Sequence, residues 1–368
     1  MKKVLYVTTV SRTVNAFLVP HIHMLLDEGY QVDIATSIDK PIEESLKHRG
    51  VGVFNIPFAR NPLHPGNLKA FKELCRIQKK GGYDIVHVHT PVASLFGRLL
   101  KLRDSRVKTI YTAHGYHFLK GGSNVGWMLY YPIEWMMAKL TDVTITINQE
   151  DYEITTKRLK PKQAYLMDGV GLDLSHYKVL SPEAICAKRQ ELGLHPDDFI
   201  IIMIAELNEN KNQIQLLKAM ERLKDKYPNI KALFVGEGLK LQELQQQATE
   251  RGIQKHVQFL GFRTDITELI NVSNIGVLLS YREGLPRNLM ELMACGRQMI
   301  GTNIRGCRDV ICDDTVGCLV EVGDDETLAH EIERLYLKND SNFSLSPHLK
   351  KYEMASVLKE LKMIYEGV

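Results

Sequence analysis

The chain has 368 residues, more than one ordinary hydrophobic core accommodates, so we expect two domains. Hydrophobic residues make up 44% and charged residues 25% of it, the balance of a globular protein rather than of a disordered or membrane-spanning one. The net charge of +3 is unevenly spread: residues 1–170 carry 23 Lys and Arg against 15 Asp and Glu, a net of +8, and the remainder carries 24 against 29, a net of −5. The basic half fits either an anionic partner or ordinary surface variation.

The first residues, MKKVLYVTTVSRT, contain a basic pair and a short apolar run that threonines interrupt. A signal peptide requires a longer apolar region and a small-residue cleavage site, and a membrane span requires about 20 apolar residues. We therefore expect a cytoplasmic protein.

Four of the six cysteines, Cys295, Cys307, Cys312 and Cys318, lie close together in the sequence. They form no C-x-x-C pair, and no histidine stands near them along the chain, so the pattern does not indicate a zinc site. We expect buried free thiols.

In the first half of the chain, short apolar runs typical of strands alternate with longer amphipathic stretches typical of helices. The predicted strands are residues 2–10, 31–38, 51–58, 84–90, 108–114 and 142–148. Residues 17–30 and 68–82 have apolar positions at helical spacing, and glycine terminates each of these predicted helices. Asn148, with Asp151 three residues later, predicts the N-cap of a further helix.

The alternation continues in the second half. The predicted strands are residues 199–207, 230–238, 256–262, 275–280, 298–302 and 317–322, and the predicted helices are residues 212–227, 239–252 and 348–367. Continuously apolar strands that alternate with helices indicate parallel sheets covered on both faces. The sequence therefore predicts an α/β protein of two Rossmann-like domains, joined near residues 167–182.

Neither half has the G-x-G-x-x-G pattern after its first strand, where the sequence reads TTVSRTVNAF and AELNENKN. A dinucleotide site depends on these glycines because they bring backbone close to the pyrophosphate, so a dehydrogenase is disfavoured. A nucleic-acid-binding protein is also disfavoured, because the basic residues are dispersed and the second half is acidic.

The segment SYREGLPRNLMELMACG, residues 280–296, combines a strand end, a loop and a helix. Glu283 and Gly284 fall on the loop, at the carboxyl edge of a parallel sheet, where open α/β sheets bind ligands. Pro286 stands in the first turn of the helix, whose N-terminus favours phosphate. Glu283 could accept hydrogen bonds from a sugar and Glu291 from a ribose, which fits a sugar nucleotide. The alternative is that both glutamates are solvated surface charges.

The stretch EGLPRNLME resembles the E-X7-E motif of retaining glycosyltransferases of the GT-B fold, glycosyltransferase family 4, also called glycosyl transferase group 1. Further stretches occur in the order that this family shows, namely HVHTPVASLFGRL, IYTAHGYHF, YYPIEWMMAKLTDVTITIN, GVGLD, ELNENKN, LFVGEG and VQFLGFRTDI. The resemblance covers nearly the whole chain and is greatest to the branch that builds bacterial capsular, exopolysaccharide or O-antigen units.

The resemblance implies a GT-B fold, in which two Rossmann-like domains with parallel sheets face a central cleft. Residues 1–170 would form the acceptor-side domain, and residues 171–345 would form the domain that binds the nucleotide sugar. The C-terminal helix, residues 346–368, would cross back to the N-terminal domain.

In this family the first motif glutamate contacts the transferred sugar and the second contacts the ribose, roles that fall on Glu283 and Glu291. The backbone at Gly284, Leu285 and Pro286 would face the sugar and the phosphates. The same segment would therefore hold both ends of the donor.

Family members usually hold the diphosphate with an arginine and, five residues later, a lysine. Here Lys211 matches the lysine, but Glu206 stands where the arginine is expected. A carboxylate does not bind a diphosphate directly. Lys211 and the helix N-terminus would then stabilise the leaving group with little other help, except from Arg287. Alternatively, Glu206 would orient Lys211.

The stretch QFLGFR resembles the segment whose backbone contacts the base, which makes Gly261, Phe262 and Arg263 candidates. Gly236 in FVGEG would lie against the nucleotide. Its other interpretation is purely structural: a tight turn at the end of the strand.

His114 in TAHGYHF matches the family histidine that faces the donor sugar near the reacting carbon. His87 and His89 alternate on a predicted strand, so both rings lie on one face, an arrangement that a metal could use. No carboxylate or cysteine is placed to complete such a site, and the chain has no D-x-D triplet. We therefore expect no bound metal and no cofactor, as the family also implies.

The basic first half would bind the acceptor. Residues 118–140, in which both tryptophans occur among lysines, suit a membrane interface or a lipid-linked acceptor. Alternatively they form a core helix packed on the sheet, which we favour for most of these side chains. Arg12 and Asn15, on the loop after the first strand, are candidate acceptor contacts. The related branch uses polyprenyl-diphosphate sugars.

We interpret the chain as a retaining, metal-independent glycosyltransferase that moves a sugar from a nucleotide sugar, a UDP-hexose or UDP-N-acetylhexosamine, to a polyprenyl-diphosphate-linked saccharide. It would work in the cytoplasm, in peripheral contact with the inner face of the cytoplasmic membrane. Two alternatives stay open: a UDP-N-acetylglucosamine 2-epimerase, and a non-catalytic sugar-nucleotide-binding protein, since Glu206 interrupts the phosphate clamp.

Overall fold

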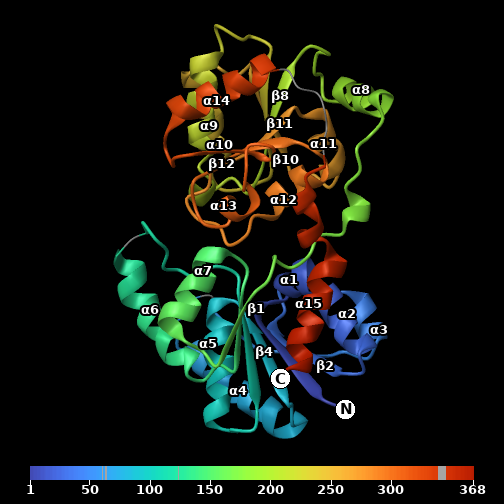
Figure 1. Cartoon of the computed structure of the whole chain (residues 1–368), viewed down its shortest axis with the longest axis vertical. Coiled ribbons are helices and arrows are strands. Elements are labelled where there is room, and N and C mark those ends of the chain that lie inside the picture. Colours follow the sequence, from blue (N-terminus) through green and yellow to red (C-terminus); the bar gives the residue numbers. More distant parts are fainter. Residues whose placement is uncertain (60, 63, 123, 339–344) are drawn as a thin grey trace. The chain divides into compact units, whose positions relative to one another are not determined.

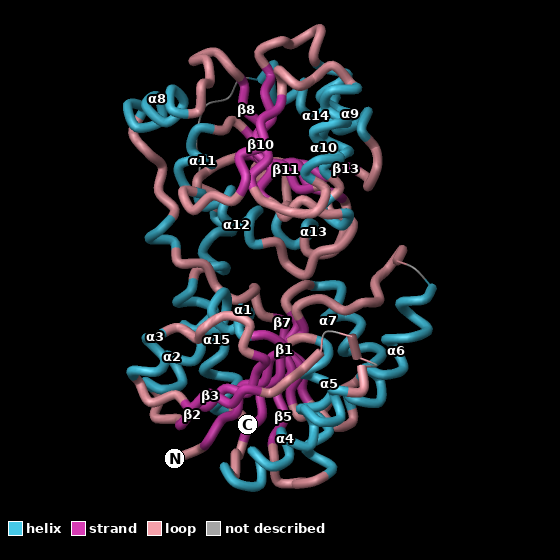
Figure 2. Tube along the Cα trace, turned by 180° about the vertical axis from the view of Figure 1, so that it is seen from behind, coloured by secondary structure: helices cyan, strands magenta, loops and turns pink. Residues whose placement is uncertain are grey.

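The structure, a computed structural model, describes residues 1–59, 61–62, 64–122, 124–338 and 345–368. The chain divides into two compact units, Met1–Gly171 together with Met354–Val368, and Leu172–Glu353. Each unit contains a parallel sheet with helices on its two faces, which Figure 1 shows in chain colours and Figure 2 shows from behind with strands in magenta.

The sheet of the first unit has the strand order β3-β2-β1-β4-β5-β6-β7, and all of its strand pairs are parallel. Its strands are β1 (Lys3–Val10), β2 (Gln31–Ser37), β3 (Gly52–Asn55), β4 (Ile85–His89), β5 (Lys108–Ala113), β6 (Val143–Thr146) and β7 (Gln163–Leu166). Its helices are α1 (Ser11–Thr13), α2 (Val19–Asp27), α3 (Glu44–His48), α4 (Gly66–Gly81), α5 (Pro91–Leu99), α6 (Asn124–Ala138), α7 (Gln149–Ile154) and α15 (Met354–Glu366).

Alternate residues of β1 enter two separate cores of this unit. Val4 and Tyr6 pack with apolar residues of α2, α3 and α15, whereas Leu5 and Val7 pack with residues of α4, α5 and α7. This alternation explains why the strand is continuously apolar, since helices cover both faces of the sheet. Asn148 caps α7 as predicted, because its side chain accepts a hydrogen bond from the Asp151 backbone N–H at 2.8 Å.

The sheet of the second unit has the strand order β10-β9-β8-β11-β12-β13 and is also parallel throughout. Its strands are β8 (Phe199–Ile204), β9 (Ile230–Val235), β10 (Val257–Gly261), β11 (Ile275–Leu278), β12 (Gln298–Thr302) and β13 (Gly317–Val320). Its helices are α8 (Pro182–Glu191), α9 (Gln213–Leu223), α10 (Leu241–Glu250), α11 (Ile266–Val272), α12 (Arg287–Ala294), α13 (Cys307–Val310) and α14 (Asp325–Lys338).

Both sheets reverse their strand order beside their first strand. In the first unit the reversal lies between β1 and β4, and in the second it lies between β8 and β11. At such a point the loops that follow the two strands diverge to opposite faces, which leaves space for a ligand at the carboxyl edge. Each unit therefore has one position where its topology favours a site.

The predicted C-terminal helix over residues 348–367 is wrong in its first part, because the structure breaks it at Glu353. Residues Pro347–Tyr352 form a 3₁₀ helix that packs in the second unit through Leu349 and Tyr352. Helix α15 starts at Met354 and packs in the first unit through residues such as Leu361. One apolar stripe thus serves two cores, and the chain passes between the units at residue 353 rather than at 345.

Candidate active site

The predicted nucleotide-sugar residues follow the carboxyl ends of four strands of the second sheet. Glu206 and Lys211 follow β8, Gly236 follows β9, residues 261–263 stand at the end of β10, and Glu283 follows β11. Because β8 and β11 are neighbours where the strand order reverses, the loops after them meet although they lie some 70 residues apart in the chain.

Lys211 and Glu283 form an ion pair at this position. The distance from Lys211 Nζ to Glu283 Oε1 is 2.5 Å, and the two side chains are 22% and 13% exposed. Lys211 ends a short 3₁₀ turn whose cap, Asn208, accepts a hydrogen bond from the Lys211 backbone N–H at 3.1 Å. Glu206 was one candidate for orienting Lys211, but the carboxylate that pairs with Lys211 in the structure is that of Glu283.

The two loops that carry this pair are fixed to each other by hydrogen bonds of Asn210. The Asn210 carbonyl accepts from the Tyr281 N–H at 2.8 Å, and the Asn210 side chain donates to the Arg282 carbonyl at 3.0 Å. On the other side of the loop, Arg305 Nε donates to the Glu283 carbonyl at 3.0 Å. Asn210 lies within the stretch ELNENKN but was not among the predicted site residues, and Arg305 lies outside the stretches that carry the resemblance.

Glu291 lies on α12, about one turn into the helix, and its side chain is 12% exposed. Its Oε1 accepts hydrogen bonds from the Tyr177 hydroxyl at 2.7 Å and from Arg287 Nε at 3.0 Å. Burial, reinforced by the charge of Glu291, raises the pKa of Tyr177 to about 12, so the phenol stays a donor. Tyr177 was not predicted from the sequence, because it stands in the linker with no pattern around it.

Two glycines let loops of this edge approach each other. Gly236 has φ +143°, and a Cβ there would stand 2.1 Å from the Ala205 carbonyl oxygen. Gly306, with φ +78°, would place a Cβ 2.4 Å from the Gly284 carbonyl oxygen. The structure thus supports the turn interpretation of Gly236, and it adds Gly306, which packs under the motif loop.

The segment after β10 has a side chain that is already paired. Arg263 forms ion pairs with Asp265 at 2.5 Å and with Glu191 at 3.4 Å, and Asp265 raises the pKa of Arg263. Phe262 is 71% exposed, and Glu206 is exposed as well. A contact from residues 261–263 to a base would therefore come from backbone rather than from the guanidinium.

His114, which follows β5 in the first unit, belongs to a group of histidines beside β1 and β4. Its Nε2 lies 3.1 Å from His89 Nδ1, and the rings of His89 and His87 lie 4.3 Å apart. Burial lowers the pKa of His114 to about 4, so the ring is neutral near pH 7. Both ring nitrogens of His87 are in hydrogen bonds, to Tyr365 Oη at 2.6 Å and Thr112 Oγ1 at 2.8 Å, which leaves neither for a metal.

These histidines predict a pH-dependent stability. Burial lowers the pKa of His21 and His114 from 6.5 to about 4, and it also lowers the pKa of His87 and His89 well below 6.5. The unfolded chain therefore binds more protons than the folded one between about pH 6.5 and 4, so stability falls as pH falls through this window.

Each such histidine contributes up to about 1.4 kcal/mol per pH unit there. Urea unfolding at pH 7.5 and 5.5 should show the loss, and His21→Gln, which can still donate to the Val170 carbonyl, should reduce the slope. An unchanged midpoint across the two pH values would contradict this.

The candidate acceptor residues do not stand on a loop, which corrects that expectation. Arg12 lies on α1, which begins directly after β1, and Asn15 lies on the π-helical turn Val14–Leu18. Arg12 is exposed and pairs with Asp39 at 2.5 Å. The Asn15 side chain donates to the Pro41 carbonyl at 2.7 Å, so it holds a neighbouring loop.

The preference for a core helix at residues 118–140 is confirmed for one set of α6 side chains and wrong for another: Trp127, Tyr130 and Tyr131 are partly buried and pack against the core of the first unit. The buried residues of α6 are Gly126, Met137 and Ala138, whereas its exposed apolar residues are Val125, Met128, Leu129, Trp135 and Met136. Figure 1 places α6 on the outside of the first unit. Lys139 lies over the Trp135 ring, with Nζ 3.7 Å from its centroid. Among the described residues, no helix combines the length and the apolar character that crossing a membrane requires.

The expectation of buried thiols holds for two of the four clustered cysteines. Cys295 and Cys307 are buried, and Cys318 is partly buried. Cys312 is exposed, which corrects the prediction, and His348 from a distant part of the chain lies near it.

Two sequence families match the chain. The family described as "Glycosyl transferases group 1" matches residues 185–352, and "Glycosyl transferase 4-like" matches residues 3–148. "Putative glycosyltransferase EpsD" of Bacillus subtilis (strain 168) is 36% identical over 374 residues, which cover 100% of this chain and 97% of the relative. A "UDP-Gal:alpha-D-GlcNAc-diphosphoundecaprenol alpha-1,3-galactosyltransferase" of Escherichia coli is 25% identical and covers 85% of this chain and 81% of its own length.

Solved structures share the fold over the whole chain. The crystal structure of Anabaena HepE in complex with UDP and glucose matches with a TM-score of 0.82 at 19% identity, and 100% of both chains is covered. At this identity the structural match shows the fold alone, whereas the sequence matches show the family. The chain therefore has the GT-B fold and belongs to the group 1 glycosyltransferases, family 4.

Proposed function

We propose that this glycosyltransferase moves a hexose or N-acetylhexosamine from a UDP-sugar to a saccharide carried on a polyprenyl diphosphate, with retention of configuration. The observation that carries the proposal is the Lys211–Glu283 pair at the carboxyl edge between β8 and β11. A cation suited to a diphosphate and a carboxylate suited to sugar hydroxyls stand side by side there, on the loop that leads into α12.

To catalyse the transfer, the protein must position the donor and stabilise the charges that develop in the transition state. As the bond between the sugar carbon and the phosphate oxygen breaks, negative charge grows on the diphosphate and positive charge grows on the sugar carbon. Lys211 and the first backbone N–H groups of α12 stabilise the diphosphate, and Glu283 holds the sugar through its hydroxyls. None of these steps requires a divalent cation, so we expect transfer to continue in EDTA.

Donor binding exchanges one ion pair for two new contacts. Lys211 and Glu283 neutralise each other in a partly buried position. The donor offers phosphate oxygens to the ammonium and hydroxyl donors to the carboxylate, so neither charge is left buried without a partner. The pair therefore presents complementary groups to the two halves of the donor.

The exposed apolar face of α6 supports a lipid-linked acceptor and contact with a membrane surface. Apolar side chains with flanking lysines, such as Trp135 beside Lys139, suit the interface of an anionic bilayer. The name of the E. coli relative specifies a diphosphoundecaprenol-linked substrate for that enzyme, which supports the same class of acceptor here.

Glu291→Gln tests the ribose contact. The amide keeps the shape and can still accept from Tyr177, but it loses the charge that strengthens hydrogen bonds to ribose hydroxyls. We expect the KM for the donor to rise about tenfold with a smaller change in kcat, because ribose binding is the same in the ground and transition states. A tenfold loss of kcat at unchanged KM, measured from initial rates, would place Glu291 at the reacting centre instead.

The donor can be identified by screening UDP- and GDP-sugars for protection against thermal unfolding. Protective sugars would then be tested for transfer to polyprenyl-diphosphate-linked saccharides, with and without EDTA. The proposal expects a UDP-sugar to protect and its sugar to appear on the lipid acceptor. Isomerisation of the donor without acceptor would identify a 2-epimerase. Binding of UDP without turnover, with Glu283→Ala leaving the biological role intact, would identify a non-catalytic protein.

A further inference from the structure

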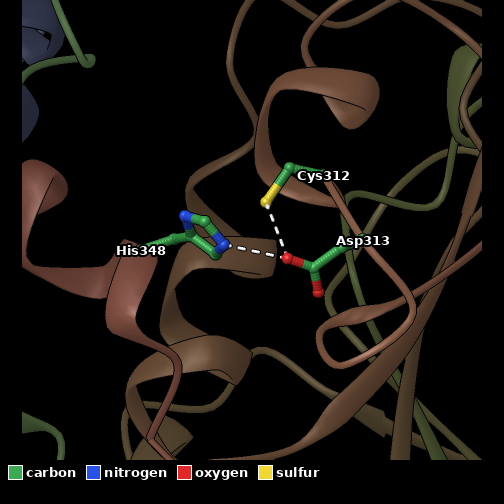
Figure 3. A group of neighbouring side chains, drawn as sticks. All are labelled: Cys312, Asp313 and His348. Atoms are coloured by element: carbon green, nitrogen blue, oxygen red, sulfur yellow. Dashed lines mark hydrogen bonds and ion pairs between the residues drawn. The ribbon is translucent and has the colours of Figure 1, made fainter.

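Cys312, Asp313 and His348 bring three different metal-ligating groups together on the second unit (Figure 3). Cys312 and Asp313 follow α13, whereas His348 lies on the 3₁₀ helix Pro347–Tyr352, 35 residues beyond Asp313. The thiol, a carboxylate oxygen and a ring nitrogen all lie within 4.8 Å of one another. In the part of the chain that the structure describes, no other group of three His, Cys, Asp or Glu side chains brings its ligand atoms this close together.

The distances suit a small tetrahedral ion. Asp313 Oδ2 lies 2.9 Å from His348 Nε2 and 3.9 Å from Cys312 Sγ. A zinc ion with bonds of about 2.3 Å to sulfur and about 2.0–2.1 Å to nitrogen and oxygen separates its ligands by about 3.3–3.6 Å. Shifts of about half an ångström in side chains at the surface therefore suffice to surround the ion.

The surrounding structure holds the ligands in place. Asp313 Oδ1 accepts hydrogen bonds from the Thr315 N–H at 2.9 Å and from the Thr315 hydroxyl at 2.5 Å, which turns Oδ2 towards His348 and Cys312. The Tyr352 hydroxyl donates to the Asp309 carbonyl at 2.8 Å, so the segment of His348 is tied to α13. Such outer hydrogen bonds orient the ligands of known metal sites.

We propose that Cys312, Asp313 and His348 bind one Zn²⁺ ion, with water as the fourth ligand. The combination of a thiolate with an imidazole selects zinc over magnesium and calcium, which prefer all-oxygen sites. The site lies outside the residues assigned to the donor, so it is separate from transfer. Bound zinc joins the loop before β13 to the segment that precedes Glu353, where the chain leaves the second unit.

Co²⁺, a spectroscopic substitute for zinc, provides the test. The full-length protein, freed of metal and kept reduced, would be titrated with Co²⁺ and followed by the near-ultraviolet absorption of a cobalt–thiolate bond. We expect one equivalent to bind, Zn²⁺ to displace it, Cys312→Ser to abolish the band, and His348→Gln to weaken binding at least tenfold. Cys312 is exposed and His348 is partly exposed, so the variants should fold.

Matched controls come from the same unit. Cys186 is also exposed, and His176 forms an exposed pair with Asp173 at 3.3 Å, so Cys186→Ser and His176→Gln should leave the band unchanged. Zn²⁺ should also raise the unfolding temperature of the wild type and not of His348→Gln, while transfer activity stays within about twofold in both. A band that persists in Cys312→Ser, that disappears in Cys186→Ser, or that never forms would overturn the proposal.

Discussion

Lys211→Ala should lower turnover by about 10²–10³-fold while the fold stays intact. The ammonium is the cation that the structure places next to Glu283, at the edge where the leaving diphosphate would lie. Since charge on the diphosphate grows as the bond breaks, the loss should fall mainly on kcat rather than on the KM for the donor. Initial rates with the identified UDP-sugar measure it, and Lys211→Arg should retain more activity than Lys211→Ala.

Lys226→Ala is the matched control for this variant. Lys226 also pairs with a glutamate at 2.5 Å, Glu333, but it lies near the amino end of β9, away from the proposed site. Its activity should match the wild type. If Lys211→Ala kept wild-type turnover, or if both lysine variants lost activity equally, the diphosphate would not lie at Lys211.

Glu134→Ala should lower the free energy of unfolding by about 3–5 kcal/mol, because it leaves the buried charge of Arg98 without its partner. Arg98 is 1% exposed, and its Nη1 and Nη2 donate to the two oxygens of Glu134 at 2.8 and 2.9 Å. Its guanidinium also lies 4.3 Å from the centroid of the Tyr111 ring. Removing the carboxylate leaves the guanidinium without its counter-charge inside the first unit. Urea unfolding of the full chain would show the lowered midpoint.

Two comparisons separate this effect from the loss of any surface ion pair. Glu73→Ala removes the partner of Arg76, a pair at 2.8 Å whose side chains are 42% and 76% exposed, and should cost at most about 1 kcal/mol. Replacing both buried partners, as Arg98→Met with Glu134→Leu, should recover much of the stability lost by Glu134→Ala alone. If Glu134→Ala and Glu73→Ala lost equal stability, the buried pair would matter no more to folding than an exposed one.

The sequence predicted the sheets where strands are buried on both faces. Strands such as β1 and β8 are runs of apolar residues, and their positions agree with the predictions apart from their ends. Strand β7 was missed, because Gln163–Leu166 is short and only partly buried at an edge of the sheet. The break at Glu353 was missed because an apolar stripe shows that residues are buried, and not that two cores divide them.

Those residues of the candidate site that belong to a local sequence pattern could be predicted. The strand–loop–helix at residues 275–296 indicated the carboxyl edge, and the resemblance indicated Lys211. Tyr177 and Arg305 could not be found in this way, since they reach the motif only through the tertiary fold. The same reason applies to Cys312, whose histidine neighbour lies far along the chain.

A crystal structure with a bound UDP-sugar tests the placement of the donor most directly. We expect diphosphate oxygens within hydrogen-bonding distance of Lys211 Nζ and of the first N–H groups of α12, with sugar hydroxyls on Glu283 and ribose hydroxyls on Glu291. A nucleotide bound away from this edge of the sheet, with the Lys211–Glu283 pair still closed, would contradict that placement.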